Sequence, residues 1–261
     1  MLRITNTRLL LYKLVLALRP APLGVAIKHL LRIKRRVVET DNGSFFVDPC
    51  SNFGILLVRD GLYEKDMVTT FKSLLTANSV CVDVGANEGY FSVIASRIVG
   101  PGGRVVAVEP QSRVLPILDK NIKLNRADNI KVHQVVISDE NGTAEIHLEP
   151  DNNTGSSGLY RTTRYRVPSE TVGMITLSAL LDQNGIDGVD LMKMDIEGGE
   201  YEAILGSREV FKSRRVRRLA LELHPVILRR RGLDPSAITS FLSASGYKLD
   251  PAYSNLVFAL S

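Results

Sequence analysis

The sequence predicts an α/β fold in which a mostly parallel sheet carries helices on both of its faces. Short apolar runs rich in β-branched residues alternate along the chain with segments of helical periodicity. One of these runs ends in a glycine turn that leads directly into a helix, and acidic residues follow several of the runs. Strands that alternate with helices in this way are typical of parallel sheets with helical crossover connections.

Composition sets the limits of this interpretation. The chain has 261 residues, of which 44% are hydrophobic, so it can hold one large α/β domain or two small ones. The two cysteines, Cys50 and Cys81, indicate neither a disulfide framework nor a thiolate metal site. Cys81 lies within an apolar run and is expected to be a buried core residue. This cysteine usage favours a reducing, cytoplasmic setting.

Residues 1–36 form a basic, apolar arm. They contain nine of the 33 Lys and Arg residues and none of the 28 acidic residues, so the rest of the chain has a net charge of −4. We expect two short helices broken at Pro20-Ala21-Pro22. The apolar run from Leu9 to Leu18 contains Lys13 and is much shorter than the roughly 20 residues that cross a membrane. Lys13 and the lack of a clear cleavage site also argue against a signal peptide.

Two interpretations of the arm stay open. Basic residues beside leucine-rich faces can lie on an anionic membrane surface, which predicts a peripheral contact of residues 1–36 at the inner membrane surface. Alternatively, the arm packs on the main domain, which we place at residues 37–261.

The first half of the main domain is expected to contain both hairpin and crossover elements. A hairpin is predicted at Val37–Thr40 and Ser44–Val47 around Asp41-Asn42-Gly43, with a further strand at 53–58. The expected elements that follow are a helix at 64–75, a strand at 80–84, a helix after Gly89, a strand at 105–108, and a helix capped by Ser112 that reaches about Leu124.

The second half continues the alternation and closes with an antiparallel edge. The expected strands are 131–136, 189–194 and 217–223, followed by 247–249 and 256–260 as the edge. An inserted hairpin strand is expected at 144–148, a polar loop at 151–158, a helix from the capping residue Thr176 to Leu181, and a helix from Pro235 to near Gly246.

The glycine turn selects among possible ligands. Its glycines are spaced Gly85-x-x-x-Gly89 and lack the G-x-G-x-x-G pattern of dinucleotide sites. Asp83 and Glu88 flank the turn and would repel a pyrophosphate, whereas S-adenosylmethionine has no phosphate and is cationic. Glu109 ends the next strand, where such folds bind ribose hydroxyls. A plain turn with acids at a helix start is the simpler alternative.

These segments resemble a known class of enzyme. Val82 to Gly89 followed by Glu109-Pro110 resembles the cofactor site of class I S-adenosylmethionine-dependent methyltransferases. Leu191 to Glu200 resembles the signature of the FkbM family, as do Gly61 to Glu64 and Leu221 to Pro225. The resemblance runs from about Val38 to the C-terminus. It implies a Rossmann-like, seven-stranded sheet with one antiparallel strand, and it makes the following residues candidates for binding S-adenosylmethionine: Asp83, Gly85, Ala86, Asn87, Gly89, Glu109, Ser138 and Asp195.

Acidic and basic residues at the ends of the later strands are candidates for catalysis. Methyl transfer to an alcohol needs a base that removes the hydroxyl proton during attack. Asp195 is the first candidate and His224 the second, Lys193 would orient the acceptor or pair with Asp195, and Glu222 lies at the neighbouring strand end. We expect no metal, although Asp195, Glu197, Glu222 and His224 form a set that would suit Mg²⁺ or Mn²⁺.

The sequence therefore predicts an O-methyltransferase that acts on a hydroxyl of a sugar, a glycolipid or a related metabolite. The basic arm favours a glycan carried on a membrane lipid. Two alternatives are an NAD-dependent oxidoreductase on a similar sheet and a non-catalytic module that binds a cofactor. A nucleic-acid acceptor is not expected, because the position after the fourth strand carries Asp195-Ile196-Glu197-Gly198 in place of an Asn-Pro-Pro-Tyr motif.

Overall fold

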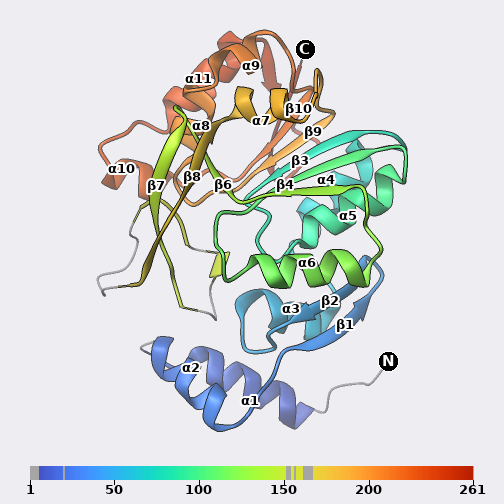
Figure 1. Cartoon of the computed structure of the whole chain (residues 1–261), viewed down its shortest axis with the longest axis vertical. Helices are drawn as coiled ribbons and strands as arrows, with labels where there is room; N and C mark the ends of the chain where they lie inside the picture. Colours follow the sequence, from blue (N-terminus) through green and yellow to red (C-terminus); the bar gives the residue numbers. More distant parts are fainter. Residues whose placement is uncertain (1–5, 20, 151–153, 156, 161–166, 261) are drawn as a thin grey trace.

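A parallel sheet forms the centre of the computed structural model, which describes residues 6–19, 21–150, 154–155, 157–160 and 167–260 (Figure 1). Within these residues the sheet has seven strands, in the order β11-β12-β10-β9-β3-β4-β5. Neighbouring strands are parallel except that β12 runs antiparallel to β10 and β11. The predicted fold class is confirmed. The strands are β3 (Val80–Val84), β4 (Arg104–Val108), β5 (Ile130–His133), β9 (Leu191–Met194), β10 (Arg218–Leu221), β11 (Tyr247–Leu249) and β12 (Leu256–Leu260).

The direction of strand progression reverses between β3 and β9. From β3 the chain moves outward to β4 and β5, and it later returns to β9 on the other side of β3 and continues to β10. Ligands of open α/β sheets bind at such a reversal, outside the carboxyl ends of the strands. The ends of β3, β4, β9 and β10 therefore meet where a ligand site is expected.

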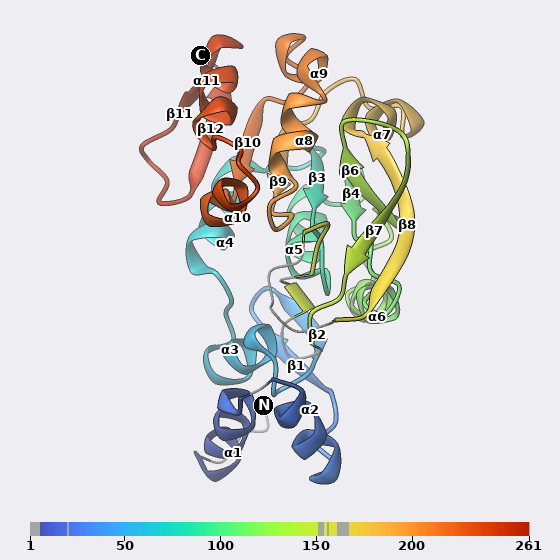
Figure 2. The same cartoon turned by 90° about the vertical axis from the view of Figure 1, so that its left-hand side faces the viewer.

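Helices cover both faces of this sheet (Figures 1 and 2). On one face, α4 and α5 pack against Cys81 and Leu191. On the other face, α7, α8, α9 and α11 pack against Val82 and Met192. Between residues 65 and 244 the described helices are α4 (Lys65–Leu74), α5 (Tyr90–Val99), α6 (Leu115–Leu124), α7 (Leu177–Gln183), α8 (Glu200–Leu205), α9 (Arg208–Lys212), α10 (Pro225–Arg230) and α11 (Ser236–Ala244).

A second sheet with the order β6-β8-β7 lies beside the main one and corrects part of the prediction. The expected strand at 131–136 is wrong in its extent, because the chain leaves the main sheet after β5. β6 (Val135–Ser138) instead pairs with β8 (Ser169–Thr176), which the sequence analysis did not predict. β7 (Gly142–His147) is the expected inserted strand and pairs with β8 in antiparallel fashion.

The predicted strand at 53–58 is wrong, because this segment lies within helix α3 (Asn52–Asp60). The Ser51 side chain accepts a hydrogen bond from the Gly54 amide, and Gly61 ends the helix in the left-handed conformation. These are strong start and stop signals for a helix. Ser112 does not cap α6, whose N-cap is Val114, whereas Thr176 caps α7 as predicted.

The arm consists of two helices, α1 (Asn6–Ala17) and α2 (Ala21–Leu30), at one end of the molecule (Figures 1 and 2). Tyr12 and Val15 pack with Cys50 and with Ile55 of α3. The arm thus packs on the domain, and the hairpin that follows it is confirmed as β1 (Arg36–Thr40) and β2 (Gly43–Val47). Within the described residues, every helix falls short of the length and apolar character needed to cross a bilayer.

Candidate cofactor and acceptor site

A pocket lies at the carboxyl ends of β3, β4, β9 and β10. Its volume is about 1230 Å³ when the space at its open mouth is included. Most of the predicted site residues line it, and they come from four separate strand ends. The lining residues that carry the argument are Gly85, Ala86, Asn87, Glu88, Glu109, Lys193, Asp195, Glu197 and Glu222.

The turn after β3 requires its two glycines. Gly85 has a φ of 87°, and a Cβ there would lie 1.9 Å from the Asp195 carbonyl oxygen. Gly89 has a φ of 86°, and its Cβ would lie 2.3 Å from Leu118 Cδ1. A side chain at Gly85 would clash with backbone, and one at Gly89 would clash with the Leu118 side chain and strain a left-handed backbone conformation. The spacing of these glycines therefore brings the turn against the end of β9, where Asp195 lies.

Glu109 is positioned to accept hydrogen bonds at the end of β4. Its carboxylate is buried and accepts hydrogen bonds from the amides of Asn87 and Gln111, at 2.9 and 3.0 Å, and from Gln111 Nε2 at 3.0 Å. Burial raises the pKa of Glu109 to about 7, although these three donors oppose the shift. Three of the about four acceptor positions of this carboxylate are used, two on Oε1 and one on Oε2, so Oε2 can accept one further hydrogen bond from a ligand hydroxyl.

A buried charge group lies beneath the turn. Lys193 Nζ lies 3.7 Å from Asp83 Oδ1 and 3.4 Å from Asp195 Oδ2. Burial lowers the pKa of Lys193, but Asp195 and Asp83 outweigh burial, and the net shift is upward. Asp83 is fully buried and accepts a hydrogen bond from Ser92 of α5 at 2.6 Å. Asp83 thus lies behind the pocket wall, and Lys193 carries its charge beside Asp195.

Three polar side chains cluster where β9 and β10 end. His224 Nε2 lies 3.8 Å from Asp195 Oδ1 and 3.4 Å from Glu197 Oε2. On its other side, Nδ1 of His224 lies 2.8 Å from Oε1 of the buried Glu200. Glu200 is fixed in turn by the amides of Ile196 and Gly198. Glu200 therefore orients the imidazole toward Asp195 and Glu197.

The pKa shifts differ between the members of this cluster. Burial lowers the pKa of His224, but the hydrogen bond to Glu200 and the charges of Glu200, Glu197 and Asp195 raise it to about 9. His224 is therefore an imidazolium at neutral pH and donates hydrogen bonds instead of accepting a proton. Burial raises the pKa of Glu197 to about 7, and burial and Asp195 raise that of Glu222. Asp195 remains the first candidate for the base.

The remaining predicted residues are distributed unevenly. Ala86 and Asn87 line the pocket, whereas Gly89 begins α5 behind it. Ser138 does not line the pocket and donates a hydrogen bond to Asp139, while Val135, Val136 and Ile137 line it just before. Asp195, Glu197 and His224 could hold a metal ion, since ligand atoms of all three lie within 4.8 Å of one another. The absence of a metal stays a prediction.

Sequence reasoning missed two side chains that organise the site. Gln111 donates two hydrogen bonds to Glu109, and Arg35 donates two to Glu88. Nothing in the local pattern marks Arg35, which lies far from Glu88 in sequence. Tyr63 and Glu64 were not missed: they belong to the segment Gly61 to Glu64, whose family resemblance suggests that they face the cofactor, and both line the pocket.

Comparison with known proteins gives a consistent picture. The family described as "Methyltransferase FkbM domain" matches residues 83–249. Methyltransferase sdnD of Sordaria araneosa is 28% identical over an alignment of 164 residues, and the match covers 52% of this chain and 62% of that protein. The 31-O-demethyl-FK506 methyltransferase FkbM of Streptomyces tacrolimicus is 27% identical over 180 residues, 58% of this chain and 68% of that protein.

Two further proteins are similar to this chain. The 2-O-methyltransferase NoeI of Sinorhizobium fredii is 25% identical over 154 residues, 52% of this chain and 60% of that protein. A solved methyltransferase FkbM from Methylobacillus flagellatus has a TM-score of 0.48 at 16% identity and covers 97% of this chain and 58% of that chain. The matches to the sdnD and NoeI proteins thus span about 60% of those relatives. Because the family match covers well over half of the sequence, the chain belongs to the FkbM family of S-adenosylmethionine-dependent methyltransferases.

Proposed function

We propose that this protein is an O-methyltransferase that transfers the methyl group of S-adenosylmethionine to a hydroxyl of a sugar, a glycolipid or a related metabolite. The observation that carries the proposal is that Glu109 and Asp195, 86 positions apart in the sequence, line the same pocket. The first supplies acceptors for ribose hydroxyls, and the second supplies a carboxylate for the acceptor hydroxyl. The names of two relatives, which specify methylation at an oxygen, support an oxygen nucleophile.

The residues present fit S-adenosylmethionine. The glycine turn brings backbone close to the ligand, and Val135 to Ile137 offer an apolar wall for a base. When bound, S-adenosylmethionine supplies a reactive methyl group on a cationic sulfur. Carboxylates at the same end of the pocket, those of Glu64, Asp195 and Glu222, favour a cationic ligand group by charge.

The chain's own groups can then prepare the acceptor hydroxyl. Asp195 is about one quarter exposed, so it can reach a bound hydroxyl and take its proton. Lys193 and the His224 imidazolium hold Asp195 from two sides and fix its orientation. The carboxylates around this point disfavour phosphorylated or carboxylated acceptors and favour uncharged polyols, since like charges at close range repel.

We expect binding of the cofactor to weaken below about pH 7. Ribose hydroxyls donate hydrogen bonds to an ionised carboxylate, and the pKa of Glu109 is raised to about 7 in the free protein. Below that pH the group must lose a proton to bind, so Kd for S-adenosylhomocysteine should rise by up to about tenfold per pH unit. Calorimetric titration between about pH 5.5 and 8 measures this. An unchanged Kd across that range, or the same slope in Glu109→Gln, would contradict the role of Glu109.

The proposed reaction is tested by methyl transfer from radiolabelled S-adenosylmethionine to a panel of uncharged sugars, glycolipids and hydroxylated metabolites. The matched control for each acceptor is its methyl ether, in which the hydroxyl proton is absent. We expect label to enter at least one hydroxyl acceptor and to be absent from its ether. Label that enters amines or carboxylates in place of hydroxyls would overturn the proposal.

A further inference from the structure

The two arm helices expose leucines on the sides that face away from the domain. In α1 the exposed leucines Leu10 and Leu14 are each 58% accessible and lie one turn apart. In α2 and just after it, Leu30 is 80% accessible, and Leu23 lies two turns earlier on the same side. Leu11 and Leu31 extend this surface. The side of α1 that faces the domain is covered, because Tyr12 and Val15 pack there.

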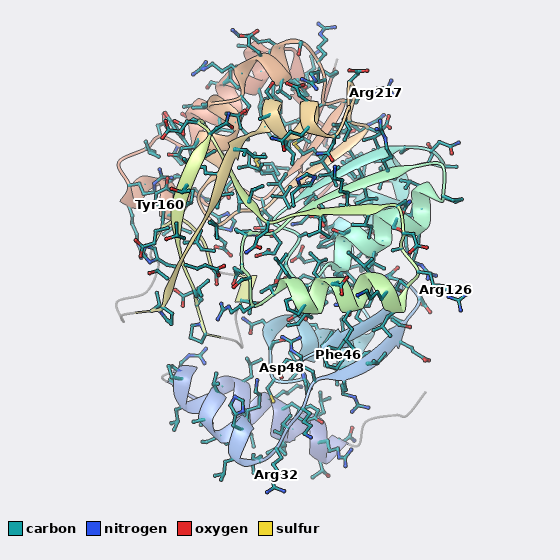
Figure 3. The ribbon with its side chains drawn as sticks, viewed as in Figure 1. Arg32, Phe46, Asp48, Arg126, Tyr160 and Arg217 are labelled. Carbon is teal, nitrogen blue, oxygen red and sulfur yellow. The ribbon has the colours of Figure 1, made fainter. Side chains whose placement is uncertain are left out.

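Positive charge surrounds these leucines. Among the described residues of the arm and the segment after it, the exposed Lys and Arg residues are Arg8, Lys13, Arg19, Arg32 and Lys34. The first acidic residue of the chain is Glu39. Figure 3 shows Arg32 at the end of the molecule formed by α1 and α2. Apolar helix faces flanked by Lys and Arg bind anionic bilayers through burial of the leucines and attraction to lipid headgroups.

The arm is held firmly against the part of the domain that forms the pocket. Helix α3 contributes Phe53 to the pocket lining and Ile55 to the contact with α1. Arg35 donates two hydrogen bonds to the pocket residue Glu88, at 3.0 and 2.8 Å. Helix α3 therefore connects the arm to the pocket, and the ion pair of Arg35 with Glu88 ties the end of the arm to the cofactor turn.

The arm makes a second fixed contact through Lys28, whose Nζ lies 2.5 Å from Oδ2 of the buried Asp48. Figure 3 shows Asp48 between the arm helices and the rest of the molecule. The cations of the inward side are thus paired with acids of the domain. The exposed cations Arg8, Lys13 and Arg32 are each within three residues of an exposed leucine in the sequence.

We propose that the surface formed by Leu10, Leu11, Leu14, Leu23, Leu30 and Leu31, with the exposed cations around it, docks on an anionic lipid bilayer. Docking holds the pocket close to the bilayer and gives it access to an acceptor carried there. The docking does not depend on the proposed function, whereas the access to a lipid-carried acceptor rests on it. A second copy of the chain is a less suitable occupant, because a symmetric contact would bring the same cations of both copies together.

Co-sedimentation with vesicles tests this proposal. The purified chain is mixed with vesicles of phosphatidylcholine alone or of phosphatidylcholine with phosphatidylglycerol. We expect at least about tenfold stronger binding to the anionic vesicles, and weaker binding at high salt. The apolar variant carries Leu10→Ser, Leu14→Ser and Leu30→Ser, and its matched control carries Val226→Ser and Leu249→Ser, which are also exposed. The charge variant carries Arg8→Gln, Lys13→Gln and Arg32→Gln.

The apolar and charge variants are each expected to lose at least about tenfold in binding, while the control binds as the parent chain does. Circular dichroism and S-adenosylhomocysteine binding, measured on every variant, show that the fold and the cofactor site are intact and separate this proposal from the proposed function. Equal binding to both kinds of vesicle would overturn the docking proposal. A loss of binding in the control as large as that in the apolar variant would also overturn it. Failure to bind vesicles would also overturn the docking proposal. If the chain then dimerises in the ultracentrifuge and the apolar variant does not, the surface belongs to a contact with a second copy.

Discussion

Replacing Asp195 with asparagine is expected to lower kcat by about three orders of magnitude. The substitution keeps the shape of the side chain and removes the carboxylate that we assign as the base, and general-base catalysis contributes about 10²- to 10⁴-fold. Lys193 keeps a partner, because Asp83 lies 3.7 Å from its Nζ. Steady-state kinetics with the best acceptor from the panel, together with titration of S-adenosylhomocysteine, measure the effect. We expect Kd for S-adenosylhomocysteine to change by less than about tenfold, because the substitution removes a group that acts on the acceptor hydroxyl.

The matched control for this variant is Asp187→Asn. Asp187 is exposed and lies outside the residues that line the pocket. It tests whether an acid-to-amide change in itself affects turnover. Retention of more than about a tenth of kcat in Asp195→Asn would contradict its role as base. In that case Glu222, which lines the same pocket and whose pKa is raised, would be the next carboxylate to replace.

Replacing Glu109 with glutamine is expected to raise Kd for S-adenosylhomocysteine by about 100-fold. A hydrogen bond to a charged group is worth about 1.5 to 3 kcal/mol, so losing the one that a ribose hydroxyl donates to Glu109 accounts for a change of this size. The amide also cannot accept all the hydrogen bonds of Asn87 and Gln111, because its nitrogen only donates. The exposed residue Glu140 provides the control variant Glu140→Gln. Calorimetric titration measures the change, with thermal unfolding recorded alongside.

A change of less than about threefold in Kd, with a folded protein, would contradict the assignment of Glu109. A large change in Glu140→Gln would show that the loss of an acidic charge anywhere on the surface weakens binding. The two acid-to-amide variants, Glu109→Gln and Asp195→Asn, act on different steps. Together they separate cofactor binding from the chemistry at the acceptor.

The parts of the site that the sequence predicts are those fixed by local geometry. Gly85 and Gly89 mark the turn because only glycine fits there, and Glu109 follows a strand that its apolar run identifies. Asp195 is found in the same way at the end of β9. These residues converge because the carboxyl ends of neighbouring parallel strands meet at one edge of the sheet.

The parts that the sequence does not predict depend on distant contacts. β6 leaves the main sheet because β8, more than 30 residues later, offers it a partner. The apolar run within residues 52–60 is equally compatible with a helix and with a strand. The cap formed by Ser51 favours the helix. The upward pKa shift of His224 requires Glu200, Glu197 and Asp195 at close range. No local pattern shows that charge environment, so the sequence alone places His224 as the second candidate for the base, after Asp195.

The two interpretations of the arm are not exclusive in the structure. Tyr12 and Val15 pack on the domain as one of them predicts. The leucines on the outward sides of α1 and α2 remain available for the contact that the other predicts. The sequence alone leaves both open because a ten-residue apolar run does not reveal which of its sides a domain will cover.

Calorimetric titration of the purified chain with S-adenosylmethionine, S-adenosylhomocysteine and NAD tests the central claim most directly. We expect the first two to bind with one site per chain and NAD to show no binding, since the carboxylates of Glu64, Asp195 and Glu222, which line the pocket, disfavour a pyrophosphate. Binding of NAD alone, or of none of the three, would contradict the assignment of the pocket to S-adenosylmethionine and limit the family relationship to the fold.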